Sequence, residues 1–284
     1  MNLSSNDVPI PFSPELFGPL RPSAYQLSDP AALRERLHSD GYLYLPGVLD
    51  REEVLRLRGG YFSQFPSGYL AAGSRSEEGV FSGRVPQGLP AYGVAGHPAH
   101  SFVRSAAFHR FLNNPRLSGL AGNLLGGSVE MLPRRILRHF HRGLGLASRA
   151  HLDFDYMNEG SSRVLTLWIP VGDCPPQTGA LVYLEDSHRL RPEEYAALRD
   201  TTDRPGDRRP ICHDLELTAR HLGRRWLWAD FAAGDVMVHL PQIIHASLDT
   251  TTNAMRLSVD VRFVRSGDTP DRRWLRSWSA DDGA

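Results

Sequence analysis

The sequence predicts an α+β protein whose second half is a sandwich or barrel of the jelly-roll kind. Apolar residues at helical spacing dominate the chain up to about residue 125, and short β-rich runs separated by turn residues follow. The 284 residues, 41% of them hydrophobic, suffice for a large core, and no shift in composition marks a second domain. We therefore expect one domain over residues 1–284.

Capping residues place the first elements of the chain. Residues 1–28 contain many Pro and Ser residues with little periodicity, which predicts an extended N-terminal arm. Asp29 followed by Pro30 predicts the start of a helix, and Gly41 predicts its end. A short apolar strand is expected next, over residues 42–46.

Two further helical stretches surround a long loop. Asp50 predicts the N-cap of a second helix, and a third helical stretch is expected over residues 102–125. Between them, residues 59–100 are rich in Gly, Ser and Pro, which predicts a loop or a lid.

The second half contains the predicted β core, over residues 130–265. A charged insertion with several prolines, at 190–225, interrupts it. Seven β-rich runs predict its strands, at 135–140, 150–157, 163–169, 179–184, 235–240, 242–247 and 255–264.

The composition excludes several classes of protein. The sequence has no lysine, so all 32 basic residues are arginines, and enzymes that need a lysine amine or a lysine-containing phosphate loop are excluded. The net charge of zero argues against a nucleic-acid partner, and no apolar run reaches the roughly 18 residues of a membrane span. Cys174 and Cys212 lack a redox or disulfide pattern, and the N-terminus lacks a secretory signal. We expect a soluble, cytoplasmic protein with a small-molecule partner.

The tripeptide His151-Leu152-Asp153 is the first candidate for chemistry. Its run is strand-like, and residues two apart on a strand face the same side, so both polar side chains would point into the barrel. With a second, distant histidine they would form the facial triad of non-haem Fe(II) oxygenases, which leaves open coordination positions. The tripeptide alone is weak evidence, because His38-Ser39-Asp40 has the same form near a helix end.

Strand context selects the distal histidine and an arginine that follows it. His245 lies in a predicted strand, and Arg256, eleven residues on, opens the returning strand, where an anchor for a dicarboxylate co-substrate is expected. The same spacing joins other His–Arg pairs, so spacing alone does not decide. The other histidines after the tripeptide are His188, His213, His221 and His239.

Four motifs follow one another along the second half of the chain. They are His151-x-Asp153, Thr166-Leu-Trp168-Ile-Pro170, Gly179-Ala-Leu181 leading to Ser187-His188, and Ala233-Gly-Asp235 through His245-Ala-Ser247 to Arg256. In this order they resemble the phytanoyl-CoA dioxygenase (PhyH-like) family over about residues 130–265. One departure is Glu185-Asp186, where the family usually has Pro-Gly, and it affects a local turn.

The resemblance implies a double-stranded β-helix, a cupin-like jelly roll, with the N-terminal helices packed on it. It implies that His151, Asp153 and His245 bind Fe(II). It further implies that Arg256 pairs with the far carboxylate of the co-substrate 2-oxoglutarate, with Ser247 and Trp168 beside it. The chemistry of arginine fits this role, because its planar guanidinium can form two hydrogen bonds to a carboxylate and stays charged when partly buried.

The implied reaction uses O2, releases succinate and CO2, and oxidises a C–H bond of a small organic substrate, in secondary metabolism. Asp153 retains the carboxylate that related halogenases lack, so hydroxylation or another C–H oxidation is expected rather than halogenation. Two alternatives remain open: a metal-dependent cupin enzyme that does not use 2-oxoglutarate, and a catalytically inactive jelly-roll binding protein. The sequence predicts neither the substrate nor the carbon attacked, and it does not distinguish hydroxylation from desaturation or ring formation. It does not predict the oligomeric state either. Polar residues that could meet the substrate are Arg138, Asp155, Arg163, Ser258, Asp260 and Arg262.

Overall fold

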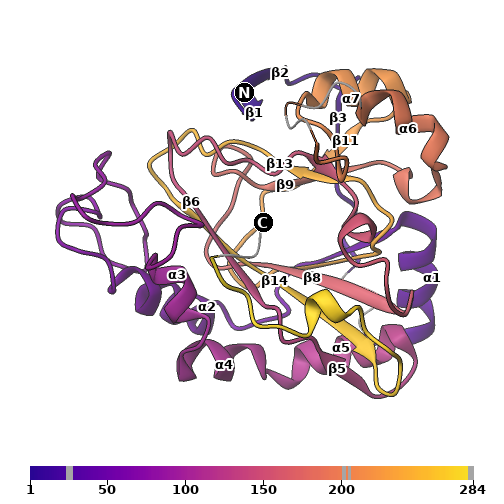
Figure 1. Ribbon diagram of the computed structural model, residues 1–284, viewed down its shortest axis with the longest axis horizontal. Helices are drawn as coiled ribbons and strands as arrows, with labels where there is room; N and C mark the ends of the chain where they lie inside the picture. Colours follow the sequence, from indigo (N-terminus) through magenta and orange to yellow (C-terminus); the bar gives the residue numbers. More distant parts are fainter. Residues whose placement is uncertain (24–27, 200–202, 204–205, 281–284) are drawn as a thin grey trace.

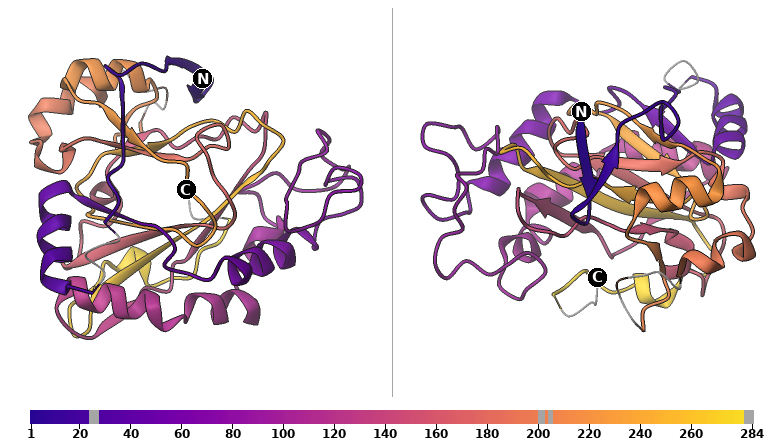
Figure 2. Two further views of the ribbon diagram at one scale, coloured as in Figure 1. Left: turned by 180° about the vertical axis from the view of Figure 1, so that it is seen from behind. Right: turned by 90° about the horizontal axis from the view of Figure 1, so that it is seen from above.

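The computed structural model describes residues 1–284 except 24–27, 200–202, 204–205 and 281–284. Parts of the predicted arm and of the predicted insertion therefore lie outside the described residues. The described chain forms two large sheets that face each other, with helices on their outer faces, and a separate two-stranded sheet near the N-terminus (Figures 1 and 2). The predicted mixed fold with a jelly-roll core and packed helices is confirmed.

The first sheet has six strands in the order β10-β7-β13-β9-β11-β3, and all its pairs are antiparallel except β11 with β3. The second has the order β4-β12-β8-β14-β5, with β6 also paired to β14. The strands of the first sheet are β3 (Phe17–Pro19), β7 (Ala150–His151), β9 (Leu181–Leu184), β10 (Pro210–Cys212), β11 (Trp226–Trp228) and β13 (His245–Ser247). Those of the second are β4 (Tyr42–Leu45), β5 (Val129–Met131), β6 (Ile136–Phe140), β8 (Val164–Pro170), β12 (Val236–His239) and β14 (Arg256–Arg265).

Strand β14 explains how the layers are built. Its side chains alternate between two faces, as in any strand. Leu257, Val259, Val261 and Phe263 belong to the hydrophobic cluster shared with the helices. The alternate residues are polar and buried between the sheets, namely Arg256, Ser258, Asp260 and Arg262. The interior of the barrel is therefore polar along this strand, while its outer face is apolar.

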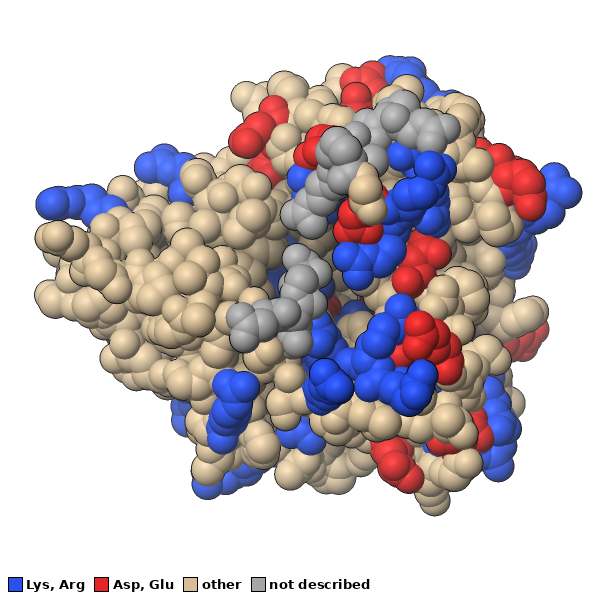
Figure 3. Space-filling model, viewed as in Figure 1, with Lys and Arg blue, Asp and Glu red and all other residues tan. Residues whose placement is uncertain are grey.

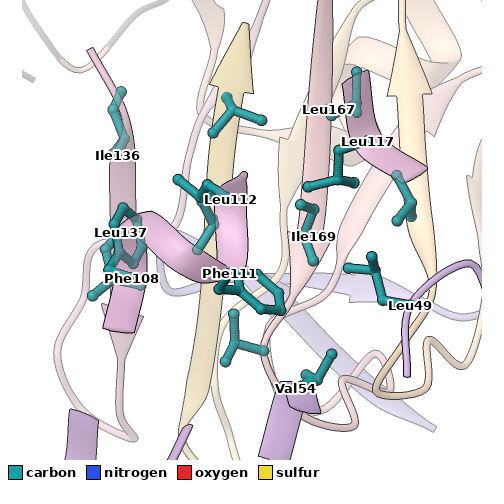
Figure 4. Close-up of a cluster of buried hydrophobic side chains, with 14 of the residues drawn as sticks. Leu49, Val54, Phe108, Phe111, Leu112, Leu117, Ile136, Leu137, Leu167 and Ile169 are labelled. Carbon is teal, nitrogen blue, oxygen red and sulfur yellow. The ribbon is translucent and has the colours of Figure 1, made fainter. Parts of the chain in front are cut away.

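The helices of the first half cover the outer face of the second sheet. Leu112 and Leu117 pack against Leu137 and Leu167 in this layer, as Figure 4 shows. The predicted stretch 102–125 consists of separate helices, because capping residues interrupt it. The helices are α1 (Pro30–Asp40), α2 (Arg51–Phe62), α3 (Pro98–Phe102), α4 (Ala106–Leu112) and α5 (Pro115–Leu125), with Ser105 and Asn114 as the caps of α4 and α5.

The N-terminal segment is extended, and it is built into the fold. Strands β1 (Asn2–Ser5) and β2 (Val8–Pro11) form a hairpin, and β3 joins the edge of the first sheet. Leu3, Ile10 and Phe17 are buried in the cluster on the outer face of that sheet. Burial of these three side chains explains why a segment rich in Pro and Ser is ordered here.

The charged insertion contributes an edge strand to the first sheet. It contains α6 (Pro192–Arg199), β10 and α7 (Leu215–Leu222), and β10 pairs with β7, the strand that carries His151. Both helices bury apolar side chains on this sheet. The loop 63–97 projects from one end of the molecule (Figure 1), and its role as a lid stays a prediction. No helix in the described ranges is long and apolar enough to cross a membrane.

A buried histidine under the helices predicts acid sensitivity. Burial lowers the pKa of His139 well below its ordinary value, with His97 and His141 adding to the effect. In the unfolded chain a histidine takes up a proton below about pH 6.5, whereas folded His139 stays neutral. Stability is thus lost as pH falls below about 6.5, by about 1.4 kcal/mol per pH unit for this group.

Urea unfolding between pH 7.5 and 5.5 measures this slope. His139→Gln is expected to show a shallower loss of stability with falling pH than the unchanged protein. His221→Gln is the control, because His221 is exposed at the end of α7. An unchanged slope in His139→Gln would contradict the prediction.

Candidate metal centre

Three predicted ligands meet between the sheets. His151 on β7 lies directly opposite His245 on β13, and their ring centroids are 4.2 Å apart. Oδ1 of Asp153 lies 3.9 Å from Nε2 of His151 and 3.8 Å from Nε2 of His245. Their candidate ligand atoms all lie within 4.8 Å of one another, and no other such group of His, Cys, Asp or Glu occurs among the described residues.

Asp153 reaches the site from a different element than expected. The predicted strand 150–157 ends at His151, and a 3-10 helix, η2 (Asp153–Tyr156), follows. Leu152 between them has extended backbone angles, so His151 and Asp153 keep the two-residue relation of a strand. The chain then turns, because the backbone N–H of Phe154 donates to the carbonyl of Pro241.

Backbone carbonyls orient both imidazoles for metal binding. Nδ1 of His151 bonds the carbonyl of Arg149 at 2.7 Å, and Nδ1 of His245 bonds that of Ile243 at 3.1 Å. A carbonyl can only accept, so Nδ1 carries the proton and Nε2 presents its lone pair. Burial lowers the pKa of both histidines, which keeps them neutral, the form that binds a metal.

The carboxylate of Asp153 is kept ionised by its surroundings. Burial alone would raise its pKa, but the guanidinium of Arg262 and the imidazole of His239 hold the pKa well below the usual range. Arg262 Nη2 donates to Oδ2 at 2.9 Å, and Thr166 Oγ1 donates to the same oxygen at 2.5 Å. The donor set of two neutral imidazoles and one carboxylate suits Fe(II).

Arg256 lies at the start of β14 with its guanidinium fully buried. Nη1 donates to the carbonyl of Gly179 at 2.8 Å, and the guanidinium lies over the rings of Phe140 and Trp168, at 4.9 and 5.7 Å from their centroids. Nη2 of Arg256 and Nε1 of Trp168 are buried donors without a hydrogen-bond partner among the described residues. Two such donors fit an anionic acceptor such as a carboxylate.

Ser247, predicted to lie beside the co-substrate, has a backbone hydrogen-bond partner. It lies two residues after His245 on β13, and its Oγ accepts a hydrogen bond from the backbone N–H of Ser148 at 2.6 Å. No hydrogen bond joins Ser247 to Arg256 in the described part of the chain. Because Oγ only accepts here, its hydroxyl proton can still be donated, and a role beside a co-substrate stays a prediction.

A surface hollow of about 520 Å³ lies between the 3-10 helix η2 and the charged insertion, and its lining contains none of the triad residues. Its lining includes Asp155, which is ion-paired with Arg199, and Arg209, which is ion-paired with Asp207. The ring of Tyr156 lies between this hollow and the triad. It contacts the His151 ring on one side, and the guanidinium of Arg209, which lines the hollow, lies over it. In the view of Figure 3, arginine side chains gather near the centre of the molecular surface, interspersed with acidic ones.

The other polar residues predicted to face the substrate divide into two groups. Arg138 pairs with Asp260 between the sheets through a 2.6 Å bond from Nε to Oδ2, and it remains partly exposed. Arg163, in contrast, is exposed at the far end of β8, where it pairs with Asp268. The other His-x-Asp tripeptide, His38-Ser39-Asp40, is not part of a metal-ligand cluster among the described residues. The carboxylate of Asp40 is instead ion-paired with Arg21 and Arg36.

Sequence reasoning missed the residues that contact Asp153. His239 was one of several histidines after the tripeptide, and Arg262 was considered only as a substrate contact. The alternation of side chains along the predicted strands could have identified both residues as facing the interior. Alternation puts His239 on the interior face of β12, and Arg262 lies six residues after Arg256 on the same face of β14.

A jelly roll with a two-histidine, one-carboxylate triad between its sheets has the arrangement of non-haem iron oxygenases. The sequence profile of the family Phytanoyl-CoA dioxygenase (PhyH) matches residues 37–258. The chain belongs to this family, and the predicted resemblance is confirmed. Comparison of the sequence with curated proteins finds no match.

Solved structures share the fold at low sequence identity. The epimerase SnoN, in complex with Fe3+, α-ketoglutarate and nogalamycin RO, is 21% identical with a TM-score of 0.56, covering 84% of this chain and 86% of its own. The α-ketoglutarate-dependent carbocyclase SnoK from nogalamycin biosynthesis is 19% identical with a TM-score of 0.57, covering 89% of each chain. EvdO2 from Micromonospora carbonacea var. aurantiaca, complexed with 2-oxoglutarate, is 20% identical with a TM-score of 0.53, covering 86% and 96%. The triad and the family support the predicted cofactors Fe(II), 2-oxoglutarate and O2.

Proposed function

We propose that the protein is a non-haem Fe(II)- and 2-oxoglutarate-dependent dioxygenase that hydroxylates a C–H bond of a small organic substrate. In the balanced reaction, substrate R–H, 2-oxoglutarate and O2 give R–OH, succinate and CO2. The observation that carries the proposal is a metal triad in the same barrel as a buried arginine whose Nη2 lacks a partner among the described residues.

Each site residue has a role that follows from its surroundings. His151, His245 and Asp153 Oδ1 would bind iron on one face and leave the other positions open. Arg256 would bind the far carboxylate of 2-oxoglutarate, with Trp168 Nε1 as a second donor. Iron and 2-oxoglutarate supply the oxidising power, while the barrel orients the reactants and excludes water.

The retained carboxylate favours hydroxylation over halogenation, because Asp153 fills the position that a halide would need. SnoN, an epimerase, and SnoK, a carbocyclase, are both from nogalamycin biosynthesis. Their likeness supports a role in secondary metabolism for this chain too.

Anaerobic titration of the purified protein with Fe(II) and 2-oxoglutarate tests the proposal. A weak visible charge-transfer band is expected once both are bound, and admission of air with a candidate substrate should release one succinate per product. Omission of iron is the control. Absence of the band with Fe(II) bound would favour a cupin enzyme that does not use 2-oxoglutarate. Absence of iron binding altogether would favour an inactive jelly-roll binding protein.

A further inference from the structure

The two oxygens of Asp153 have different environments. Oδ1 faces Nε2 of both triad histidines. Oδ2 instead receives hydrogen bonds from Thr166 Oγ1 at 2.5 Å, from Arg262 Nη2 at 2.9 Å and from His239 Nε2 at 3.3 Å. Three donors saturate the lone pairs of one oxygen and leave the other for a metal.

The three donors lie on three neighbouring strands of the second sheet. Thr166 on β8 is directly opposite Arg262 on β14 and opposite His239 on β12. Adjacent strands of a sheet hold their side chains in fixed register, so the donors cannot shift independently. All three are buried, and their positions are therefore set by the sheet rather than by a loop.

Further contacts fix two of the donors in place. The Arg262 guanidinium lies 4.3 Å from the centroid of the Trp274 ring. The hydroxyl of buried Tyr183 lies 3.1 Å from Nδ1 of His239. A carboxylate accepts only, so Nε2 of His239 carries the proton, and Nδ1 accepts from Tyr183.

We infer that Arg262, His239 and Thr166 are positioning residues that hold Asp153 to one-oxygen metal binding, through Oδ1, and so preserve a coordination position for O2. This inference rests on the proposed function. A carboxylate can bind a metal with one oxygen or with two. Iron held by one carboxylate oxygen and two imidazoles would keep open positions for both 2-oxoglutarate and O2. If Asp153 bound with both oxygens, the position for O2 would be lost.

Nitric oxide, a stable stand-in for O2, reports that position directly. The probe is the electron paramagnetic resonance signal of nitric oxide added anaerobically to the protein with Fe(II) and 2-oxoglutarate. In Arg262→Leu we expect the visible 2-oxoglutarate band to persist while the affinity for nitric oxide falls at least about tenfold, because only the one-oxygen form can bind it. The Fe(II) dissociation constant should also rise, by about 10- to 100-fold.

Matched variants separate positioning from folding. Arg163→Leu removes an exposed arginine–aspartate pair at the far end of β8 and should change neither affinity. Thr166→Val keeps the side-chain shape but removes one donor, and it should weaken nitric oxide binding, whereas Thr166→Ser should restore it. This pair keeps the test decisive if Arg262→Leu does not fold.

Nitric oxide and Fe(II) affinities in Thr166→Val equal to those of the unchanged protein would overturn the inference. So would equal affinities in a folded Arg262→Leu. Failure of the proposed function looks different, because the unchanged protein would then lack the 2-oxoglutarate band, while the effect on Fe(II) affinity could still be measured.

Discussion

Replacement of His245 by alanine is expected to abolish both iron binding and succinate release. His245 Nε2 faces Asp153 and His151, so its loss leaves two of the three proposed ligands. Because the ligands act as one unit, the rate of succinate release should fall at least about 10³-fold. Anaerobic calorimetry with Fe(II) and an oxygen-dependent succinate assay measure the two effects.

His38→Ala is the matched control, since His38 belongs to the rival His-x-Asp tripeptide and lies near the C-terminal end of α1. It should bind iron as the unchanged protein does, and His151→Ala should behave like His245→Ala. Iron loss in His38→Ala, with iron retained in either triad variant, would show that the metal centre has been placed at the wrong tripeptide.

Arg256→Ala should lose 2-oxoglutarate while keeping iron. The guanidinium is buried beside Phe140 and Trp168, and a carboxylate bound there would lose its charged partner. Truncation of a buried hydrogen-bonded charge typically costs 2–5 kcal/mol, so we expect a roughly 100-fold rise in the 2-oxoglutarate dissociation constant. The visible charge-transfer band, titrated anaerobically with 2-oxoglutarate, measures it.

Arg163→Ala is the control for this substitution, because it removes an exposed strand arginine that pairs with Asp268. Fe(II) affinity measured without 2-oxoglutarate should be the same in both variants. A 2-oxoglutarate affinity in Arg256→Ala equal to that of Arg163→Ala would remove Arg256 from the co-substrate site.

The sequence predicted site residues best where a histidine or arginine lies within a predicted strand. Strand context selected His245 and Arg256, and the structure places both on strands with their side chains buried. The strand expected for residues 150–157 was wrong beyond His151, because local alternation does not reveal that the Pro241 carbonyl captures the N–H of Phe154. That contact depends on a segment nearly ninety residues away, and only tertiary structure brings it near.

The contacts of Asp153 illustrate the same limit. Thr166, His239 and Arg262 are far apart in sequence and meet because β8, β12 and β14 are neighbours in one sheet. The alternation of side chains along one strand predicts which face of the sheet each residue lies on. It does not predict which strands are neighbours, so it cannot predict which residues contact each other across the sheet. The burial of the N-terminal segment could not be predicted for the same reason, because it depends on the pairing of β3 with β11 at the edge of the first sheet.

Strand β14 has a consequence for how the protein can evolve. Its outward residues, such as Val259 and Val261, belong to the apolar layer under the helices, whereas its inward residues include Arg256 and Arg262. Volume-conserving apolar substitutions at the outward positions should alter stability and leave the chemistry intact. A single strand thus carries two sets of positions that selection can adjust separately, and a saturation mutagenesis of residues 256–263 should show tolerance that alternates with every residue.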